Sequence, residues 1–307
     1  MIMMTFKQLI QSALLVGSMA SFCANAFEVK DAKGTHEWQQ PAKRVVVLNW
    51  SAAEAMFTLG VTPVGMADPN GYDDWVKLPK RPTDITNIGM RGEPNLERIH
   101  QLKPDVIISG AEQGSAYQSL AQISPVLSFD TFRVDHQNGP AVDQAFLNMA
   151  KAVGKEPEAK AFLAQRTKKI AQWREQLEAH FNHHIPKVVM VHFSDTSHVS
   201  AYGKNSTIEY ALSQLGIKPA LPSKQTAWGM TTLPLQQLAQ VNEGVVIYIR
   251  PFTQEKKLFS SVLWQHLPFV NKGHFLTVEP CWTYGSAESV EHIAQAATQA
   301  LLTLPKS

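Results

Sequence analysis

Aromatic residues recur in this sequence at places where a ligand could be held. Trp50 directly follows an apolar run, Trp75 lies in a polar loop, and Trp228 precedes a glycine. Trp282 and Tyr284 lie in a Cys-Trp-Thr-Tyr-Gly motif near the C-terminus. Tryptophan and tyrosine supply a large apolar surface together with one polar group. Any one of them could simply anchor a loop, but five in such positions across both halves of the chain favour a shared aromatic cleft.

Arg91 is the polar side chain best placed to recognise a ligand. Gly89 and Gly92 flank it and leave the backbone unhindered, and a helix is predicted to start just after it. A guanidinium group offers a planar fork of donors that suits the oxygen atoms of a metal chelate. The alternative is a salt bridge to Glu93 or Glu97, which would occupy the same donors. The local sequence leaves both interpretations open.

The sequence lacks three common catalytic or phosphate-binding motifs. G-x-S-x-G, G-x-x-x-x-G-K and H-E-x-x-H are all absent. An extracytoplasmic hydrolase, the alternative from another class of protein, would need an activated nucleophile that no motif supplies. His180, His183 and His184 lie close together and could bind a metal ion, although imidazoles at a helix C-terminus are also stabilised by the helix dipole. We therefore expect no enzymatic activity, no intrinsic cofactor and no metal site made of protein side chains.

The elements that would position these residues recur in both halves of the chain. In the first half, residues 44–48 predict a buried strand, residues 51–59 a short helix, and residues 61–65 the start of the next strand. Ser51, followed by Glu54 three residues later, predicts a capping box at the start of the helix. The half is completed by a predicted helix at 95–102 and a predicted strand at 106–108.

The second half repeats this order in pattern, not in identity. Residues 187–191 predict a strand, and residues 207–215 predict a helix that ends at Gly216. A helical stretch at 235–240 then leads into a predicted strand at 245–249. Strands that alternate with helices favour parallel sheets covered on both faces. The duplication therefore predicts an α/β fold of two similar lobes with mainly parallel central sheets.

A long helical segment separates the two halves. Residues 158–181 contain no Gly or Pro, and Pro157 suits the first turn of a helix. At 1.5 Å per residue, such a helix would be roughly 36 Å long, enough to bridge two domains. The alternative is an ordinary surface helix within one domain. We expect the bridge, with residues 27–157 as the N-terminal lobe, residues 158–184 as the interdomain helix and residues 185–307 as the C-terminal lobe.

The N-terminus has the three-part plan of a secretory signal peptide, which we assign to residues 1–26. Lys7 precedes an apolar stretch, and Ala24-Asn25-Ala26 supplies the small residues of a cleavage site. A membrane anchor is the weaker interpretation, because the apolar run is shorter than about 20 residues and polar residues interrupt it. We expect cleavage before Phe27 instead of lipid attachment at Cys23, and hence a periplasmic protein.

The composition argues against several other classes of protein. Charged residues make up 18% of the chain and apolar residues 44%, which is typical of a globular protein with a packed core. The net charge of +2 comes from interspersed residues of both signs, so we expect no nucleic-acid partner. Cys23 and Cys281 are the only two cysteines, which excludes a disulfide framework and a cysteine metal site.

Eight segments spread over the chain form a set with a known counterpart. They are residues 44–54, 59–65, 89–97, 102–105, 202–206, 228–229, 264–270 and 282–285. Together they resemble the periplasmic ferric-siderophore-binding proteins, which are the class III substrate-binding components of ABC importers. The resemblance covers nearly the whole mature chain. The Trp-Gly and Trp-x-Tyr-Gly motifs are similar to those of the ferric-hydroxamate (ferrichrome-type) branch.

This resemblance implies two lobes joined by a long helix, with a ferric chelate bound in the cleft between them. It implies that Arg91 donates hydrogen bonds to hydroxamate oxygens. It also implies a cleft lined by Trp50, Trp75, Trp228, Trp282 and Tyr284. Tyr202 and Arg250 lie in segments that correspond to the cleft and are further candidates for ligand binding. The implied partners are an iron(III)-hydroxamate siderophore and an inner-membrane ABC permease with its ATPase subunit, and members of the family are usually monomers.

The charge of the chelate favours hydroxamate over catecholate. Iron(III) with three singly charged hydroxamates is neutral and needs shape, apolar contact and a few donors. A tris-catecholate carries three negative charges and would need several Lys or Arg residues. The expected cleft loops offer Arg91 and Arg250 among many aromatic residues. Mixed citrate-hydroxamate chelates satisfy the same argument, and a carboxylate or catecholate siderophore, haem or cobalamin bound by the same fold are the alternatives.

The sequence departs from the family pattern at three glutamines. The cleft tyrosine of the hydroxamate branch falls on Gln113, and Tyr117, four residues later, could take its place. The acidic residues that dock on the permease fall on Gln118 and Gln236. Docking would then use other surface carboxylates, such as Glu93, Glu97 or Glu243.

Overall fold

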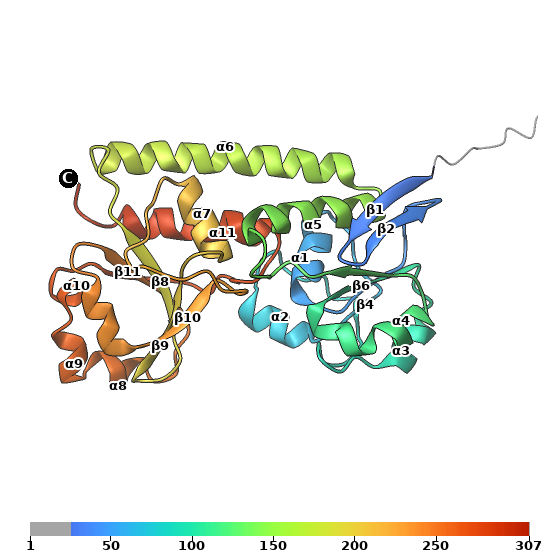
Figure 1. The fold of residues 1–307 in the computed structure, drawn as a ribbon, viewed down its shortest axis with the longest axis horizontal. Helices are drawn as coiled ribbons and strands as arrows, with labels where there is room; N and C mark the ends of the chain where they lie inside the picture. Colours follow the sequence, from blue (N-terminus) through green and yellow to red (C-terminus); the bar gives the residue numbers. More distant parts are fainter. Residues whose placement is uncertain (1–25, 307) are drawn as a thin grey trace, which may run out of the picture.

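The computed structural model describes residues 26–306, which form two α/β lobes side by side (Figure 1). The predicted signal peptide, apart from Ala26, lies outside the described residues. Within the range that is described, no helix is both long and apolar enough to cross a membrane. A two-stranded antiparallel hairpin of β1 (Phe27–Asp31) and β2 (Gly34–Trp38) precedes the first lobe.

The N-terminal lobe is built on a five-stranded parallel sheet with the order β5-β4-β3-β6-β7. Its strands are β3 (Val45–Val47), β4 (Gly65–Met66), β5 (Thr86–Asn87), β6 (Val106–Gly110) and β7 (Val126–Phe129). Its helices are α1 (Trp50–Thr58), α2 (Pro69–Trp75), α3 (Leu96–Gln101), the 3₁₀ helix η1 (Ala111–Ala116), α4 (Tyr117–Ala121) and α5 (Asn138–Ala152).

Both faces of this sheet are buried. Val45 and Val47 belong to the core that includes residues of α1 and α5, whereas Val46 belongs to a second core with residues of α3 and α4. Successive residues of a strand point to opposite faces, so adjacent valines enter different cores. This burial explains why the apolar run that predicted β3 has no polar alternation.

The C-terminal lobe has a mixed five-stranded sheet with the order β10-β9-β8-β11-β12. Its strands are β8 (Val188–Phe193), β9 (His198–Tyr202), β10 (Met230–Pro234), β11 (Val245–Ile249) and β12 (Phe275–Val278). Its helices are α7 (Thr207–Gln214), the 3₁₀ helix η2 (Leu235–Gln240), α8 (Glu255–Phe259), α9 (Val262–Gln265), α10 (Pro268–Asn271) and α11 (Ala287–Leu301). β8, β11 and β12 are parallel, as predicted, but β9 and β10 add antiparallel strands at one edge that the sequence analysis did not identify.

The long helix α6 (Glu156–His180) runs along one side of both lobes (Figure 1). It starts two residues before the predicted segment and ends one residue before the predicted end, with Pro157 in its first turn. The predicted helix that joins two lobes is therefore confirmed. A second helix also connects the lobes, because α11 packs on α7 in its own lobe and also contacts α1 and α5 of the other lobe.

The capping box predicted at the start of α1 is wrong. The N-cap is Asn49, whose side chain accepts a hydrogen bond from the backbone nitrogen of Ala52. Glu54 is fully buried, and its carboxylate instead meets the start of α11. Its Oε1 accepts hydrogen bonds from the backbone nitrogens of Ser286 (3.1 Å) and Ser289 (2.7 Å), and its Oε2 accepts one from Ser289 Oγ (2.7 Å). One lobe thus caps a helix of the other.

Burial moves the titration of the Glu54 carboxyl group toward neutral pH. Burial raises the pKa of Glu54 from 4.5 to about 8, although the three hydrogen bonds oppose the shift. Because the folded protein then binds this proton more tightly than the unfolded chain, the protein loses stability as pH rises from about 4.5 to about 8. Glu54→Gln removes the titration and keeps the amide oxygen as an acceptor. We expect the unfolding free energy of the variant, relative to the natural protein, to rise by more than about 1.4 kcal/mol across this window.

Urea denaturation of both proteins at a series of pH values would measure that difference. A difference that stays constant between pH 4.5 and 8 would mean that Glu54 is ionised throughout and that the N-terminus of α11 stabilises its charge.

Candidate ligand-binding cleft

The strands of the N-terminal lobe deliver three loops to one edge of their sheet. β3, β6 and β7 are parallel neighbours, so their carboxyl ends lie together at one edge of the sheet. The residues that follow them, 49–51, 110–112 and 129–132, line one side of a cavity of about 400 Å³. Ligands of open α/β sheets bind outside the carboxyl ends of the strands. The topology therefore places the cavity where a ligand is expected.

The C-terminal lobe supplies the opposite wall of this cavity. Trp228 lies two residues before β10, Met230 is the first residue of β10, and Trp282 and Tyr284 follow β12. Gly229 has a φ of +62°, and a Cβ atom there would lie 2.1 Å from the backbone nitrogen of Ser206. Only glycine fits so close an approach, which holds the loop of Trp228 against the body of its lobe.

Aromatic rings form a continuous chain across the two lobes. The rings of Trp50 and Trp282 have centroids 4.9 Å apart, and Trp282 lies 5.7 Å from Tyr284. Tyr284 in turn lies 5.1 Å from Trp228 and 5.6 Å from Phe132, which stacks on Trp228 at 5.4 Å. Trp50 and Phe132 belong to one lobe and the other three rings to the second. The aromatic surface thus exists only when the lobes are together.

Arg91 lies at the edge of this surface. Its guanidinium carbon is 3.8 Å from the centre of a Trp50 ring, a cation–π contact. Its Nε is 3.9 Å from Asp68 Oδ2, and its Nη1 is 3.7 Å from Glu112 Oε1. These are long ion pairs, and they differ from the salt bridge to Glu93 or Glu97 that the sequence analysis considered. The side chain is 28% exposed and lines the cavity, so its donors can reach a ligand.

Gln113 does not line the cavity, although it was predicted as a ligand-binding residue. It is 1% exposed, and its Nε2 donates a hydrogen bond of 2.8 Å to the backbone oxygen of Arg91. Its Oε1 accepts a hydrogen bond of 2.8 Å from the backbone nitrogen of Gly110. The glutamine therefore ties the segment of Arg91 to the end of β6, and it supports the cavity from behind.

Four other predicted residues also lie outside the cavity lining. Trp75 is an exposed residue at the end of α2, and Tyr117 lies at the start of α4, where its ring contacts Lys33. Arg250 lies 3.7 Å from Glu255 and 3.8 Å from Glu279. Tyr202 is buried behind Tyr284, with ring centroids 6.5 Å apart. Of the ten predicted residues, the structure brings five together around one cavity: Trp50, Arg91, Trp228, Trp282 and Tyr284.

Tyr202 instead forms part of a buried polar chain. Its hydroxyl lies 2.9 Å from His192 Nδ1 and accepts a hydrogen bond of 3.3 Å from Thr283 Oγ1. Burial lowers the pKa of His192 to about 4, so the imidazole is neutral at physiological pH. Burial also raises the pKa of the Tyr202 phenol. These groups fix the segment next to Trp282 and Tyr284 without carrying charge.

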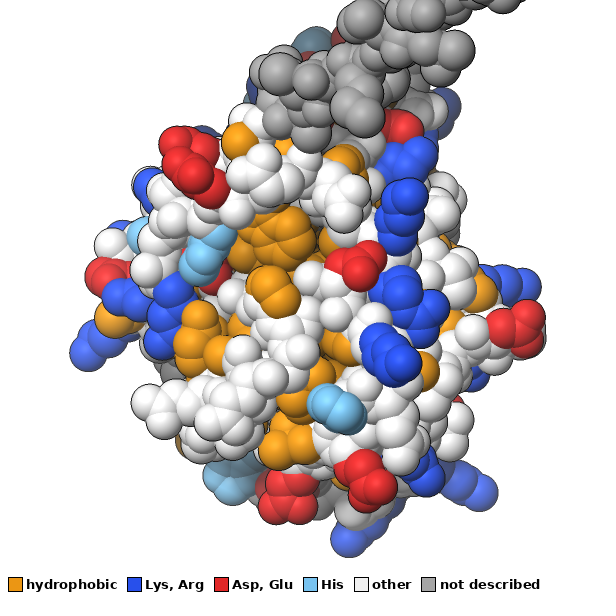
Figure 2. Space-filling view, turned by 90° about the vertical axis from the view of Figure 1, so that its right-hand side faces the viewer, with side chains coloured by type: hydrophobic (Ala, Val, Ile, Leu, Met, Phe, Trp, Pro, Cys, Tyr) orange, Lys and Arg blue, Asp and Glu red, His pale blue; other side chains and the backbone are white. Residues whose placement is uncertain are grey.

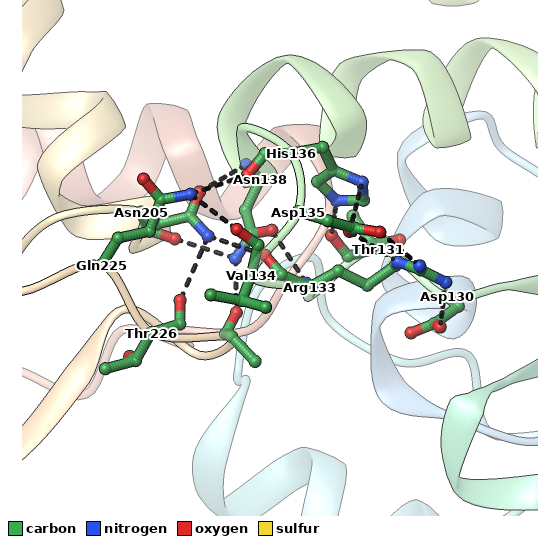
Figure 3. A network of polar contacts seen from close by, with 11 residues as sticks. Asp130, Thr131, Arg133, Val134, Asp135, His136, Asn138, Asn205, Gln225 and Thr226 are labelled. Carbon is green, nitrogen blue, oxygen red and sulfur yellow. Dashed lines mark hydrogen bonds and ion pairs between the residues drawn. The ribbon is translucent and has the colours of Figure 1, made fainter.

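A second polar network joins the loop after β7 to the other lobe (Figure 3). Asn138 Nδ2 donates hydrogen bonds to the backbone oxygens of Asn205 and Ala227, at 2.9 and 2.7 Å. Asn205 Nδ2 donates to the backbone oxygens of Arg133 and Thr226, at 2.8 and 3.1 Å. Three of these four carbonyls lie close to the rings in sequence: Arg133 follows Phe132, and Thr226 and Ala227 are the two residues before Trp228. The two buried asparagines therefore set how these rings meet.

The segment 129–132 contributes Phe129, Asp130, Thr131 and Phe132 to the cavity, although none of them was predicted to bind a ligand. The signal was present, because residues 126–129 form a short apolar run followed by polar and aromatic residues. Because ligands bind outside the carboxyl ends of parallel strands, Phe132, which follows this run, could have been predicted as a ligand-binding residue. Glu112 was missed for a similar reason, since it follows β6 but lies outside any motif.

Among residues 26–306, no group of three or more His, Cys, Asp and Glu side chains is arranged to hold a metal ion. Two of the three neighbouring histidines form hydrogen bonds with backbone oxygens: His180 Nε2 with that of Leu304, and His184 Nδ1 with that of Asn182. The cavity itself offers aromatic rings, one guanidinium group and two carboxylates. Such a lining suits a preformed chelate better than a bare ion.

A second hollow, of about 980 Å³, lies between the β1–β2 hairpin and α4. Figure 2 looks onto this end of the molecule, where apolar side chains gather with Lys and Arg residues beside them. The hollow is lined by Arg44, Asp105 and Pro125, which precede β3, β6 and β7. It therefore lies at the amino ends of the strands, the edge opposite to that at which ligands of such sheets bind.

Comparisons with known proteins agree with this geometry. A family model for periplasmic binding proteins matches residues 45–280. The iron(3+)-hydroxamate-binding protein FhuD of Escherichia coli is 28% identical over 260 residues, which cover 84% of this chain and 86% of that protein. The Fe(3+)-citrate-binding protein YfmC of Bacillus subtilis is 30% identical over 273 residues, which cover 87% and 83%.

A solved structure gives a similar result. The siderophore-binding protein FhuD from Vibrio cholerae, crystallised with Fe3+–Desferal bound, superposes with a TM-score of 0.83. It is 38% identical, and the match covers 85% of this chain and 98% of that chain.

Proposed function

Because this chain belongs to the periplasmic binding protein family, we propose that it captures an iron(III)-hydroxamate siderophore and delivers it to an ABC importer. One observation carries the proposal: a guanidinium group and aromatic rings from both lobes meet around one cavity between the lobes. The proposed ligand remains intact, so the protein is a carrier and not an enzyme. The iron is held by the siderophore, and no protein side chain needs to bind it.

The chemistry of the cavity matches a hydroxamate chelate. Three hydroxamates leave iron(III) neutral, with oxygen atoms that accept hydrogen bonds and an apolar periphery. Arg91 provides a planar fork for these oxygens. Trp50, Trp228, Trp282 and Tyr284 provide apolar surface against the carbon chain of the ligand. In the family pattern a tyrosine takes the position of Gln113; here the hydroxyl groups in the cavity lining are those of Ser51, Thr131 and Tyr284.

We propose capture with only small movement of the lobes. Wide opening would break the hydrogen bonds of Glu54 with α11 and those between Asn138 and Asn205. It would also separate the stacked rings of Phe132 and Trp228. Buried polar groups that lose their partners are costly, so the closed arrangement is favoured with or without ligand.

Delivery requires that the loaded protein dock on an inner-membrane permease, whose ATPase subunit supplies the energy. Gln118 and Gln236, at the positions where the family carries acidic docking residues, are both exposed. Three exposed carboxylates are candidates to replace them: Glu93, Glu97 and Glu243. We propose that the protein acts in the periplasm as a monomer, with both lobes in contact with the permease.

Titration of tryptophan fluorescence in the mature protein tests the proposed ligand. The panel is ferrichrome, ferrioxamine, ferric aerobactin, a ferric catecholate, ferric citrate, haem and cobalamin. We expect saturable quenching at low concentrations of the hydroxamates and little quenching by the others, because three tryptophans lie around the cavity. Quenching by a catecholate, citrate, haem or cobalamin alone would contradict the hydroxamate assignment. Hydrolysis products after long incubation would instead favour the alternative of a hydrolase.

A further inference from the structure

The positive and negative charges of the side chains around the cavity do not cancel. Arg91 pairs with Asp68 and Glu112, and Arg133 pairs with Asp130 and Asp135. These contacts join two guanidinium groups to four carboxylates, so the group carries a formal charge of −2. Of the six residues, Arg91, Glu112 and Asp130 line the cavity, and no lysine does so among the described residues. The negative charge stands out because the full chain has a net charge of +2.

Two of these carboxylates are open to a ligand. The side chain of Glu112 is 44% exposed and that of Asp130 is 28% exposed. Their contacts with arginine, 3.7 and 3.3 Å, are longer than the 2.7–2.9 Å or so of a strong charge-assisted hydrogen bond. Both carboxylates therefore keep oxygen atoms that can accept hydrogen bonds from a bound cation.

The sheet places these two carboxylates on the same side of the cavity. β6 and β7 are parallel neighbours, and Gly110 at the end of β6 is paired with Phe129 at the end of β7. Glu112 follows Gly110 by two residues, and Asp130 follows Phe129 directly. Arg91, stacked on Trp50, belongs to the same lobe and can hold the hydroxamate oxygens. The cavity thus combines a donor for the iron-binding centre with acceptors for a positively charged group.

From this arrangement we propose that the protein selects a ferric trihydroxamate with a pendant ammonium group, and that Glu112 and Asp130 hold that group. The inference rests on the proposed function and names the charge class of its ligand. Opposite charges attract across a partly desolvated cavity, whereas ferric citrate and ferric catecholates are anionic and are repelled. The aromatic rings add attraction for a cation through their faces.

A pair of ligands that differ only in this charge tests the proposal. Ferrioxamine B is a linear trihydroxamate that ends in a primary amine, and its N-acetylated form has the same iron-binding centre without the positive charge. Calorimetric titration of the mature protein with both should give about tenfold tighter binding of the amine form at low salt. The preference should shrink as the salt concentration rises, because salt screens partly exposed charges.

The variant E112Q/D130N should reduce the ratio of the two affinities to below about twofold, because neither amide attracts a cation as a carboxylate does. The matched control is E28Q/E37Q, which removes the same number of charges from exposed residues of the β1–β2 hairpin, outside the cavity lining. The control should keep the full preference.

The outcomes separate this proposal from the proposed function. Equal affinity of the natural protein for both chelates would overturn the proposal and leave a hydroxamate carrier. A preference that persists in E112Q/D130N would overturn the role of the two carboxylates. Failure of the folded natural protein to bind either chelate, or ferrichrome, would overturn the proposed function itself.

Discussion

Replacing Arg166 with methionine is expected to lower the free energy of unfolding by about 3–5 kcal/mol. Arg166 is 3% exposed, and its Nη1 and Nη2 donate hydrogen bonds of 2.7 and 2.6 Å to the carboxylate of Asp143. Asp143 also accepts a hydrogen bond of 2.8 Å from the hydroxyl of Tyr210. The group joins α6, α5 and α7, and therefore both lobes.

The cost arises from the partner that is left behind. Methionine can fill much of the space of the arginine stem, but Asp143, with 19% of its side chain exposed, would lose its counter-charge. The pair itself contributes little net stability, because burying its charges is costly. The buried Nε atom of Arg166 adds to this cost, since it has no hydrogen-bond partner among the described residues. A double variant, Arg166→Met with Asp143→Leu, should therefore recover part of the loss.

The same helix offers a matched control. Arg174 pairs with Glu178 at 2.8 Å on the surface of α6, and 52% of its side chain is exposed. Arg174→Met should cost less than about 1 kcal/mol, because exposed ion pairs contribute little. Urea denaturation of the three variants and the natural protein measures these differences. Equal losses in Arg166→Met and Arg174→Met would show that the buried pair does not hold the lobes together.

Replacing Arg91 with alanine is expected to weaken binding of a ferric hydroxamate by about 10- to 150-fold. A hydrogen bond to a charged group contributes about 1.5–3 kcal/mol, which corresponds to that range. The loss also leaves Asp68 and Glu112 without their guanidinium partner, so two carboxylates would repel the oxygens of the chelate. Arg91→Lys keeps the charge but loses the planar fork and the stacking on Trp50. Its affinity should therefore lie between those of the natural protein and of Arg91→Ala.

Arg250→Ala provides the control for this measurement. Arg250 was predicted to bind the ligand, but it contacts Glu255 and Glu279 and does not line the cavity. We expect less than a twofold change in affinity for this variant. Equilibrium dialysis with radioactive iron is the suitable measurement, because removal of Arg91 also changes the surroundings of Trp50. Unchanged binding by Arg91→Ala would remove Arg91 from the proposed contacts.

Several elements of this protein could be predicted from the sequence because their signals are local. The apolar runs of β3 and β11 lack polar residues since both faces of each strand are buried. The helix α6 follows from a long stretch without Gly or Pro. The repeated order of strands and helices was sufficient to predict two lobes. Half of the predicted site residues also line the cavity, because the carboxyl ends of parallel strands meet at one edge of a sheet.

Other features were decided by the tertiary structure alone. Glu54 looked like part of a local capping box, but its partners are 232 and 235 residues away. Tyr202 carries the right chemistry for a ligand contact, but the register of β9 with β8 and β10 places it behind Tyr284. Gln113 supports the backbone of Arg91 from a buried position.

The charge of the cavity shows the same division between sequence and tertiary structure. The sequence identified Arg91 and the aromatic residues as types that recognise a chelate. Only the packing of the start of α2, η1 and the loop after β7 brought Asp68, Glu112 and Asp130 around the guanidinium groups. Local sequence encodes periodicity, turns and burial, because these depend on near neighbours. Which side chains meet across two lobes depends on how the sheets and helices pack, and this packing determined the partners of Glu54, Arg91 and Arg166.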